Sequence, residues 1–98
     1  MLSKNQIRFL KAQAHHLQPV VLIGAQGTSE GVDREINLAL DSHELIKIKL
    51  GNLDDEIQDN MITHIINTHA AELIQKIGHS AIFYRQNAKN PKILLPNV

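Results

Sequence analysis

The sequence contains no cysteine, few aromatic residues and no long apolar run. The absence of cysteine excludes disulfides, cysteine nucleophiles and zinc–thiolate sites. Only Phe9, Phe83 and Tyr84 are aromatic, which argues against a surface that stacks successive bases on aromatic rings. No apolar run approaches the roughly 18–20 residues of a membrane span, and no apolar region of a signal peptide is visible. We therefore expect a cytoplasmic protein with no membrane partner.

The length and composition fit a single domain, which we place at residues 1–98. Of the 98 residues, 43% are apolar, enough for one modest core. The net charge is zero, but the charges are grouped along the chain. They sum to +3 over residues 1–23, −4 over 24–46, +2 at Lys47 and Lys49, −4 over 54–78 and +3 over 79–98. Such grouping predicts one basic and one acidic side of the folded domain.

Apolar residues at helical spacing predict three helices, at residues 4–17, 29–42 and 54–67. Ser3 and Gln6 fit a capping box for the first helix, and Thr28 or Ser29 can cap the second. The first helix carries a second stripe that contains no acid; its members are Lys4, Arg8, Lys11 and His15. A solvated helix face is the commoner explanation of such a stripe, but most soluble helices mix both signs.

Alternating or β-branched runs predict strands at residues 20–23, 45–50, 72–77 and 80–85. In the second run, apolar residues alternate with Lys47 and Lys49, so one face is buried and the other is wet and basic. Residues 72–77 could instead extend the third helix. We prefer a strand because Gly78-His79 suits a type II′ hairpin turn. Residues 92–98 are expected to form a tail, with Ile93–Leu95 tied to a sheet edge.

The predicted order of elements is α-β-α-β-α-β-β. This order indicates an α+β fold, a two-layer α/β sandwich in which helices cover a four-stranded mixed sheet. The first strand runs into the segment Gly24-Ala25-Gln26-Gly27 and then into a helix start. Glycines allow backbone amides to approach an anion, and a helix N-terminus adds free N–H groups. A nucleotide-hydrolase loop would need a Lys that is absent. The pattern therefore leaves two interpretations, an RNA backbone clamp or a plain turn.

The six histidines do not predict a metal site. His64 and His69 are five residues apart, and His15 and His16 are adjacent, whereas a helical metal pair needs a spacing of four. We interpret His64 as a half-buried, hydrogen-bonded residue. The serines all have local structural explanations and no catalytic constellation is visible. We therefore expect no catalytic residue, no metal and no cofactor.

Four segments, in this order and spacing, resemble the CRM domain: "LKAQAHHLQPVVLIGAQGTSEGV", "EINLAL", "HELIKIKL" and "IGHSAIFYR". This is the RNA-binding domain of chloroplast splicing and ribosome maturation factors, and the resemblance is closest to the bacterial single-domain YhbY-like members. It covers nearly the whole chain. It implies a fold similar to the C-terminal domain of translation initiation factor three, preceded by one extra helix. It also implies a non-catalytic protein that binds ribosomal RNA in large-subunit precursors.

The resemblance and the residues together suggest an RNA-binding surface. The family's G-x-x-G loop corresponds to Gly24, Ala25, Gln26 and Gly27, followed by Thr28. Many relatives have a basic residue inside this loop; Ala25 and Gln26 leave contacts from backbone amides only. Positive charge would come from six other residues: Lys4, Arg8 and Lys11, if the first helix packs beside the loop, and Lys47, Lys49 and Arg85, if their strands are neighbours.

Two other functions stay open at this stage. The chain could be a protein-interaction module that docks a ribosomal or assembly protein through the acidic faces of its second and third helices. A small-molecule phosphate enzyme is a third and weaker alternative. We expect a monomer whose partner is RNA, with ribosomal proteins as a further class of partner.

Overall fold

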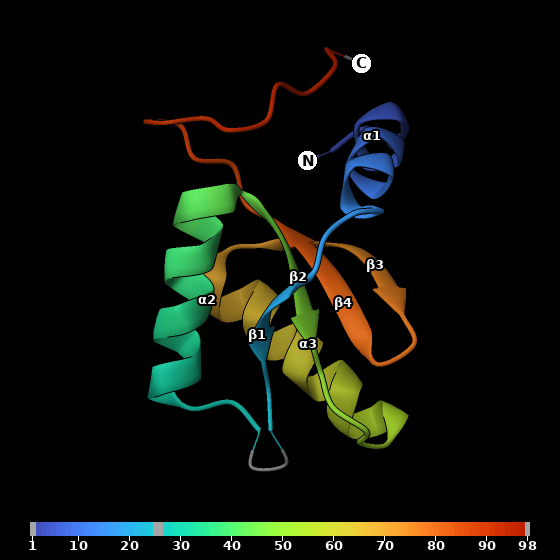
Figure 1. Ribbon diagram of the computed structural model, residues 1–98, viewed down its shortest axis with the longest axis vertical. Coiled ribbons are helices and arrows are strands. Elements are labelled where there is room, and N and C mark those ends of the chain that lie inside the picture. The colour runs from blue at the N-terminus through green and yellow to red at the C-terminus, as the bar shows by residue number, and fades with distance from the viewer. Residues whose placement is uncertain (1, 25–26, 98) are drawn as a thin grey trace.

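The computed structural model describes residues 2–24 and 27–97 and confirms the predicted α+β fold (Figure 1). The predicted order of elements is also confirmed. The first helix ends at Ala14, three residues before its predicted end, and the capping box at Ser3 and Gln6 is present. The elements are α1 (Lys4–Ala14), β1 (Pro19–Leu22), α2 (Glu30–His43), β2 (Leu45–Lys49), α3 (Asp55–His69), β3 (Glu72–Ile77) and β4 (Ser80–Tyr84).

The four strands form one mixed sheet in the order β1-β2-β4-β3. Strands β1 and β2 are parallel, and β4 lies antiparallel between β2 and β3. The hairpin between β3 and β4 turns through Gly78, at a φ of +56°, and His79. Of the two loop residues, only the first has a positive φ, which agrees with the predicted type II′ turn.

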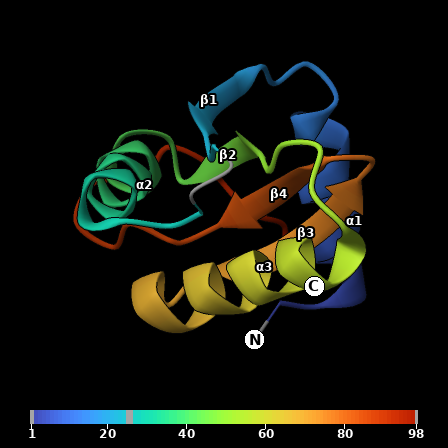
Figure 2. The same ribbon diagram turned by 90° about the horizontal axis from the view of Figure 1, so that it is seen from below.

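Helices α2 and α3 cover one face of the sheet, and α1 lies on the other (Figure 2). The larger core fills the space between the sheet and the two helices. Strand alternation supplies Ile46 and Ile48 of β2, which pack with Ile36 and Leu40 of α2 and with Ile65 of α3. All five side chains are fully or almost fully buried. The sheet and these two helices form the two-layer sandwich that the sequence predicts.

On the opposite face, α1 covers only part of the sheet. Leu10 and Ala14 of α1 pack on Leu45, Ile82 and Tyr84 to form a second, smaller core. The backbone of α1 lies closest to β2 and β3. The rest of this face is uncovered, and the side chains of β1 show it: Val20 is 48% exposed and Leu22 is 66% exposed.

A bulge in β3 sets the direction of its last side chains. The register against β4 shifts between Leu73 and Gln75, and such a bulge turns two successive side chains to the same face. Gln75 and Ile77 therefore point toward the α1 side. Lys76 points toward α3, where its ammonium lies 3.3 Å from Asp59.

The C-terminal tail is held by a buried carboxylate, and Ile93–Leu95 form no strand, so the expected tie to a sheet edge is wrong. Glu44 follows α2 with a φ of +64° and is fully buried. Its carboxylate accepts hydrogen bonds from the backbone N–H groups of Asn87 (2.6 Å), Lys92 (2.6 Å) and Ile93 (2.7 Å). A strand at this position would need backbone hydrogen bonds to a neighbouring strand. These backbone N–H groups instead donate to one side-chain carboxylate.

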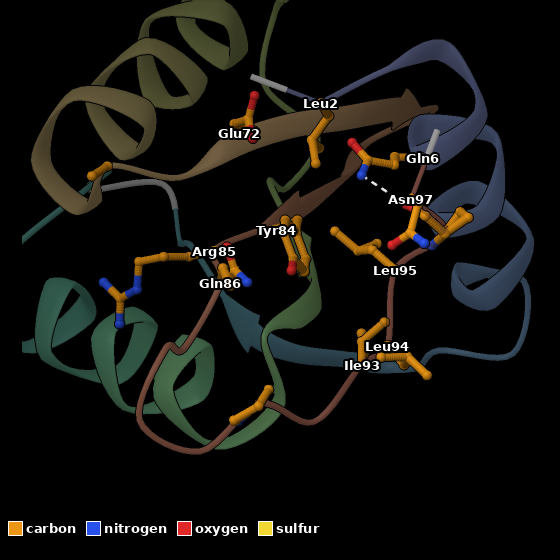
Figure 3. A pocket seen from close by; sticks show the side chains of 13 residues that line it. Leu2, Gln6, Glu72, Tyr84, Arg85, Gln86, Ile93, Leu94, Leu95 and Asn97 are labelled. Carbon is orange, nitrogen blue, oxygen red and sulfur yellow. Dashed lines mark hydrogen bonds between the residues drawn. The ribbon is translucent and has the colours of Figure 1, made fainter.

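The tail closes over a groove beside Tyr84, which Figure 3 shows in close-up. Leu2, Ile93 and Leu95 line the groove, and Gln6 donates a hydrogen bond to the carbonyl of Pro96 (2.9 Å). The hydroxyl of Tyr84 is buried and has no hydrogen-bond partner among the described residues.

Across the described ranges, 2–24 and 27–97, no helix is long and apolar enough to span a membrane.

Candidate functional site

The uncovered part of the sheet combines apolar and basic side chains; we call it the open face. It consists of Val20 and Leu22 of β1, Lys47 and Lys49 of β2, and Ile77 of β3. Leu22 pairs with Lys49 across the parallel strands, so the two side chains are neighbours. Lys47 is half-buried and Lys49 is exposed. The alternation predicted for this strand, with its lysines away from the core, is confirmed.

Helix α1 adds basic side chains to the edge of the open face. Lys11 and His15 line a shallow cavity of about 230 Å³ together with Lys47, Gln75 and Ile77. The structure thus brings Lys11 and Lys47, which are far apart in sequence, to one site. Gln75 and Ile77 also belong to this site, and neither carries a site signal of its own in the sequence. Their orientation depends on the bulge in β3, which leaves no clear signal in the sequence.

Lys4 and Arg8 do not flank the glycine loop. Helix α1 lies at the end of the sheet where β1 begins, and β1 then runs away from it toward the loop (Figure 1). Both side chains are exposed on α1, but the expected packing of the first helix beside the loop is not found. The reason is the direction of β1, which places its whole length between the helix and the loop.

Arg85 is turned to the opposite side of the sheet, which corrects its expected place in the basic surface. Its guanidinium donates to Asp41 Oδ1 (2.8 Å), to Asn37 Oδ1 (3.0 Å) and to the carbonyl of His69 (3.2 Å). It therefore ties α2 to the C-terminus of α3. Strand alternation explains the direction, since Phe83, two residues earlier, packs in the larger core. The sequence "SAIFYR" already contained this signal.

We expect the substitution Arg85→Ala to lower the free energy of unfolding by about 1–3 kcal/mol, because it removes charge-assisted bonds to Asp41 and to two backbone carbonyls. Urea denaturation measures the change. Lys89→Ala, at an exposed position in the tail, is the control and should leave stability nearly unchanged. Equal midpoints for the two variants would contradict a structural role for Arg85.

The glycine loop lies at the end of the sheet away from α1. Ala25 and Gln26, two of the predicted contact residues, lie outside the described residues. The N–H of Gly27 donates to the carbonyl of Gly24 (3.0 Å), and Gly27 has a φ of +79°. These two features define a tight turn that leads through half-buried Thr28 to α2. Its end position requires glycine-like backbone freedom.

Helix α2 begins directly after this turn, as the sequence predicts. Ser29 is its N-cap, and the Ser29 hydroxyl accepts a hydrogen bond from the N–H of Val32 (3.2 Å). The first N–H groups of α2 therefore follow Gly27 closely, and an anion is favoured at such a helix N-terminus. Glu30 and Asp33 in the first turn of the helix oppose this effect. The loop is suited to a backbone contact with one phosphate and supplies little net positive charge.

The two glycines of the loop should respond differently to alanine. In Gly27→Ala an alanine must keep the positive backbone φ of this position, so we expect a loss of roughly 1 kcal/mol in the free energy of unfolding. In Gly24→Ala the added methyl meets no atom within 4 Å, and stability should be unchanged. Thermal unfolding of both variants checks this. A greater loss at Gly24 than at Gly27 would contradict the turn geometry.

The histidines of α3 serve the packing of helices. His64 Nε2 and His69 Nε2 each lie 3.1 Å from Asp33 Oδ1 of α2. Burial raises the pKa of Asp33, but the hydrogen bonds from His69 and His64 outweigh it and hold the pKa below its ordinary value. The predicted hydrogen-bonded state of His64 is confirmed. In the part of the chain that the structure describes, no group of three or more His, Asp or Glu side chains could hold a metal ion.

Comparisons with a family model, with related sequences and with a solved structure agree with one another. The family model of the CRS1/YhbY (CRM) domain matches residues 2–85. A Haemophilus influenzae protein named "RNA-binding protein" is 45% identical over 95 residues, which cover 97% of this chain and 95% of that protein. A Pseudomonas aeruginosa protein named a probable RNA-binding protein is 36% identical, over 95% of this chain and 89% of its own. The solution structure of a Staphylococcus aureus protein superimposes with a TM-score of 0.82 at 30% identity, over 98% of this chain and all of that one.

Proposed function

Because the chain belongs to the CRS1/YhbY (CRM) domain family, we propose that it binds RNA through the open face of its sheet and the glycine loop. We further propose that this RNA is ribosomal RNA in precursors of the large subunit, and that the protein assists ribosome assembly in the cytoplasm without catalysing a reaction. The names of the relatives support RNA as the ligand. The resemblance to ribosome maturation factors supports the choice of ribosomal RNA.

The observation that carries the proposal is the meeting of three lysines on one uncovered face. Lys11 and Lys47 line one cavity, and Lys49 lies two residues beyond Lys47 on the same side of β2. None of the residues that line this cavity is acidic. Ammonium groups gathered on one face suit the phosphates of a nucleic-acid backbone, since phosphate contacts provide most of the affinity.

The open face and the glycine loop would contact the RNA in different ways. The lysines would bind phosphates along one stretch of backbone, while the amides beside Gly27 would bind a further phosphate by hydrogen bonds. Val20 and Leu22 offer exposed apolar surface beside the lysines for riboses or base faces. No aromatic side chain lies on the open face as defined, so shape and backbone should dominate recognition.

The acidic helix faces support a docking role less well. On α3, the carboxylates of Asp55 and Asp59 share the ammonium of Lys76 at 3.7 and 3.3 Å. On α2, Asp41 is paired with Arg85. Pairing within the chain reduces the charge left for a basic protein partner. We therefore propose RNA, and not a protein, as the principal ligand.

Titration of a large-subunit ribosomal RNA fragment at several salt concentrations tests the proposal. Fluorescence anisotropy should show saturable binding. The logarithm of the association constant should fall linearly with the logarithm of the salt concentration, with a slope of roughly 0.7–0.9 per phosphate contacted. Three lysine contacts predict a slope of about 2–3. Absence of saturable binding at low salt would overturn RNA binding. Equal co-sedimentation with mature and precursor subunits would overturn the assembly role alone.

A further inference from the structure

A second cavity, of about 350 Å³, lies beside the open face where α1 meets the start of β1 and β2. We call it the Leu45 pocket. We propose that it receives one unstacked nucleobase, so that the protein selects among bases at one position of its RNA. The inference rests on the proposed function and deepens it, because it assigns base selection to a defined part of the same surface.

The floor and walls of the Leu45 pocket suit the flat faces of a base. Leu17, Val20 and Leu45 line it from three segments of the chain, and Ile93 of the tail closes one side. Leu45 is buried and forms the floor, whereas Val20 is half exposed at the mouth. An unstacked base loses contact with its neighbours, and an apolar slot restores part of that contact. A volume near the low end of small-molecule sites is adequate for a single base.

The rim of the Leu45 pocket suits the polar edge of a base. Gln13, Gln18, His16 and His43 all line it. Amide side chains offer both donors and acceptors, and imidazoles offer one of each when neutral. None of these four side chains takes part in a side-chain hydrogen bond or ion pair within residues 2–24 and 27–97. Their hydrogen-bonding groups are therefore available to a ligand.

Lys47 connects the Leu45 pocket to the phosphate-binding surface. Its side chain lines both this pocket and the 230 Å³ cavity with Lys11. A nucleotide whose base enters the Leu45 pocket would thus have its phosphate beside Lys47, and the chain could continue toward Lys11 or Lys49. The arrangement joins one selective position to several non-selective ones, as expected where phosphate contacts position the RNA and a base contact specifies it.

The test uses three RNA hairpins with the same stem and loops of uniform A, U or C. Wild-type protein should rank the three loops over a range of about 10-fold or more in affinity. The double variant Gln13→Ala, His43→Ala should compress the range to about twofold and leave the salt slope unchanged, because it removes no phosphate contact. Both side chains are exposed on helices, so the variant should fold; its melting temperature verifies this.

The control double variant, Gln86→Ala with Asn90→Ala, removes two exposed polar side chains that line neither the Leu45 pocket nor the cavity at Lys11, and it should keep the wild-type ranking. The outcomes separate the two proposals. If no hairpin binds, the proposed function fails. If all three bind equally to wild-type protein with a normal salt slope, or if the ranking survives in the Gln13, His43 variant, RNA binding stands and the base pocket is overturned.

Discussion

Glutamine in place of Glu44 is expected to lower the free energy of unfolding by about 3 kcal/mol or more. The carboxylate of Glu44 is fully buried and accepts three backbone hydrogen bonds, two at Oε1 and one at Oε2. Glutamine has nearly the same shape but only one acceptor oxygen. Its NH₂ group would face at least one of the three backbone donors, which would then be left unpaired in the interior.

Urea denaturation, with tail amide exchange as a second measurement, checks the Glu44 prediction. Exchange should accelerate most at Asn87, Lys92 and Ile93, whose N–H groups lose their acceptor. Glu35→Gln on the exposed side of α2 is the matched control and should change stability by less than about 0.5 kcal/mol. A Glu44→Gln protein as stable as this control would show that the tail is not held by the carboxylate.

Charge reversal at both lysines of β2, Lys47→Glu with Lys49→Glu, is expected to weaken RNA binding roughly 10- to 100-fold near 0.1 M salt. The variant loses two cations from the open face and adds two repulsive charges. The slope of log affinity against log salt should also fall by about two. Folding should persist, because the buried side of β2 consists of Ile46 and Ile48, which are unchanged.

The single reversal Lys89→Glu controls for net charge. Lys89 is exposed in the tail segment, beside Asp41 and away from the open face. It should cost little affinity and leave the salt slope nearly intact. If Lys89→Glu weakens binding as much as the double reversal on β2, the RNA responds to overall charge, and the open face is not the binding surface.

Most of the fold could be predicted because each element carries its own local signal. The capping box at Ser3, the alternation around Lys47 and the glycine turn at Gly78 are all readable within a few residues. The structure adds little to those elements beyond their ends. It confirms the order α-β-α-β-α-β-β.

The site could be predicted only in part, since it depends on which elements meet. Lys11 and Lys47 share a cavity because of how α1 crosses the sheet, which no local pattern specifies. The positive charge of Arg85 suggests a place in the basic surface, but strand alternation turns its side chain to the opposite side of the sheet. Glu44 was missed because an acid at a helix end resembles any surface acid. Its three partners lie 43, 48 and 49 residues away.

The position of Tyr84 gives the molecule an optical reporter of its own tail. Tyr84 is the only tyrosine and the chain has no tryptophan, so near-ultraviolet emission comes almost entirely from this one ring. Burial, together with the charges of Glu44 and Glu72, raises the pKa of Tyr84 above 10. Its phenol is a weaker acid in the folded state, so folding should lose stability as the pH rises above about 10. Alkaline spectroscopic titration would therefore follow the exposure of this ring without an added label.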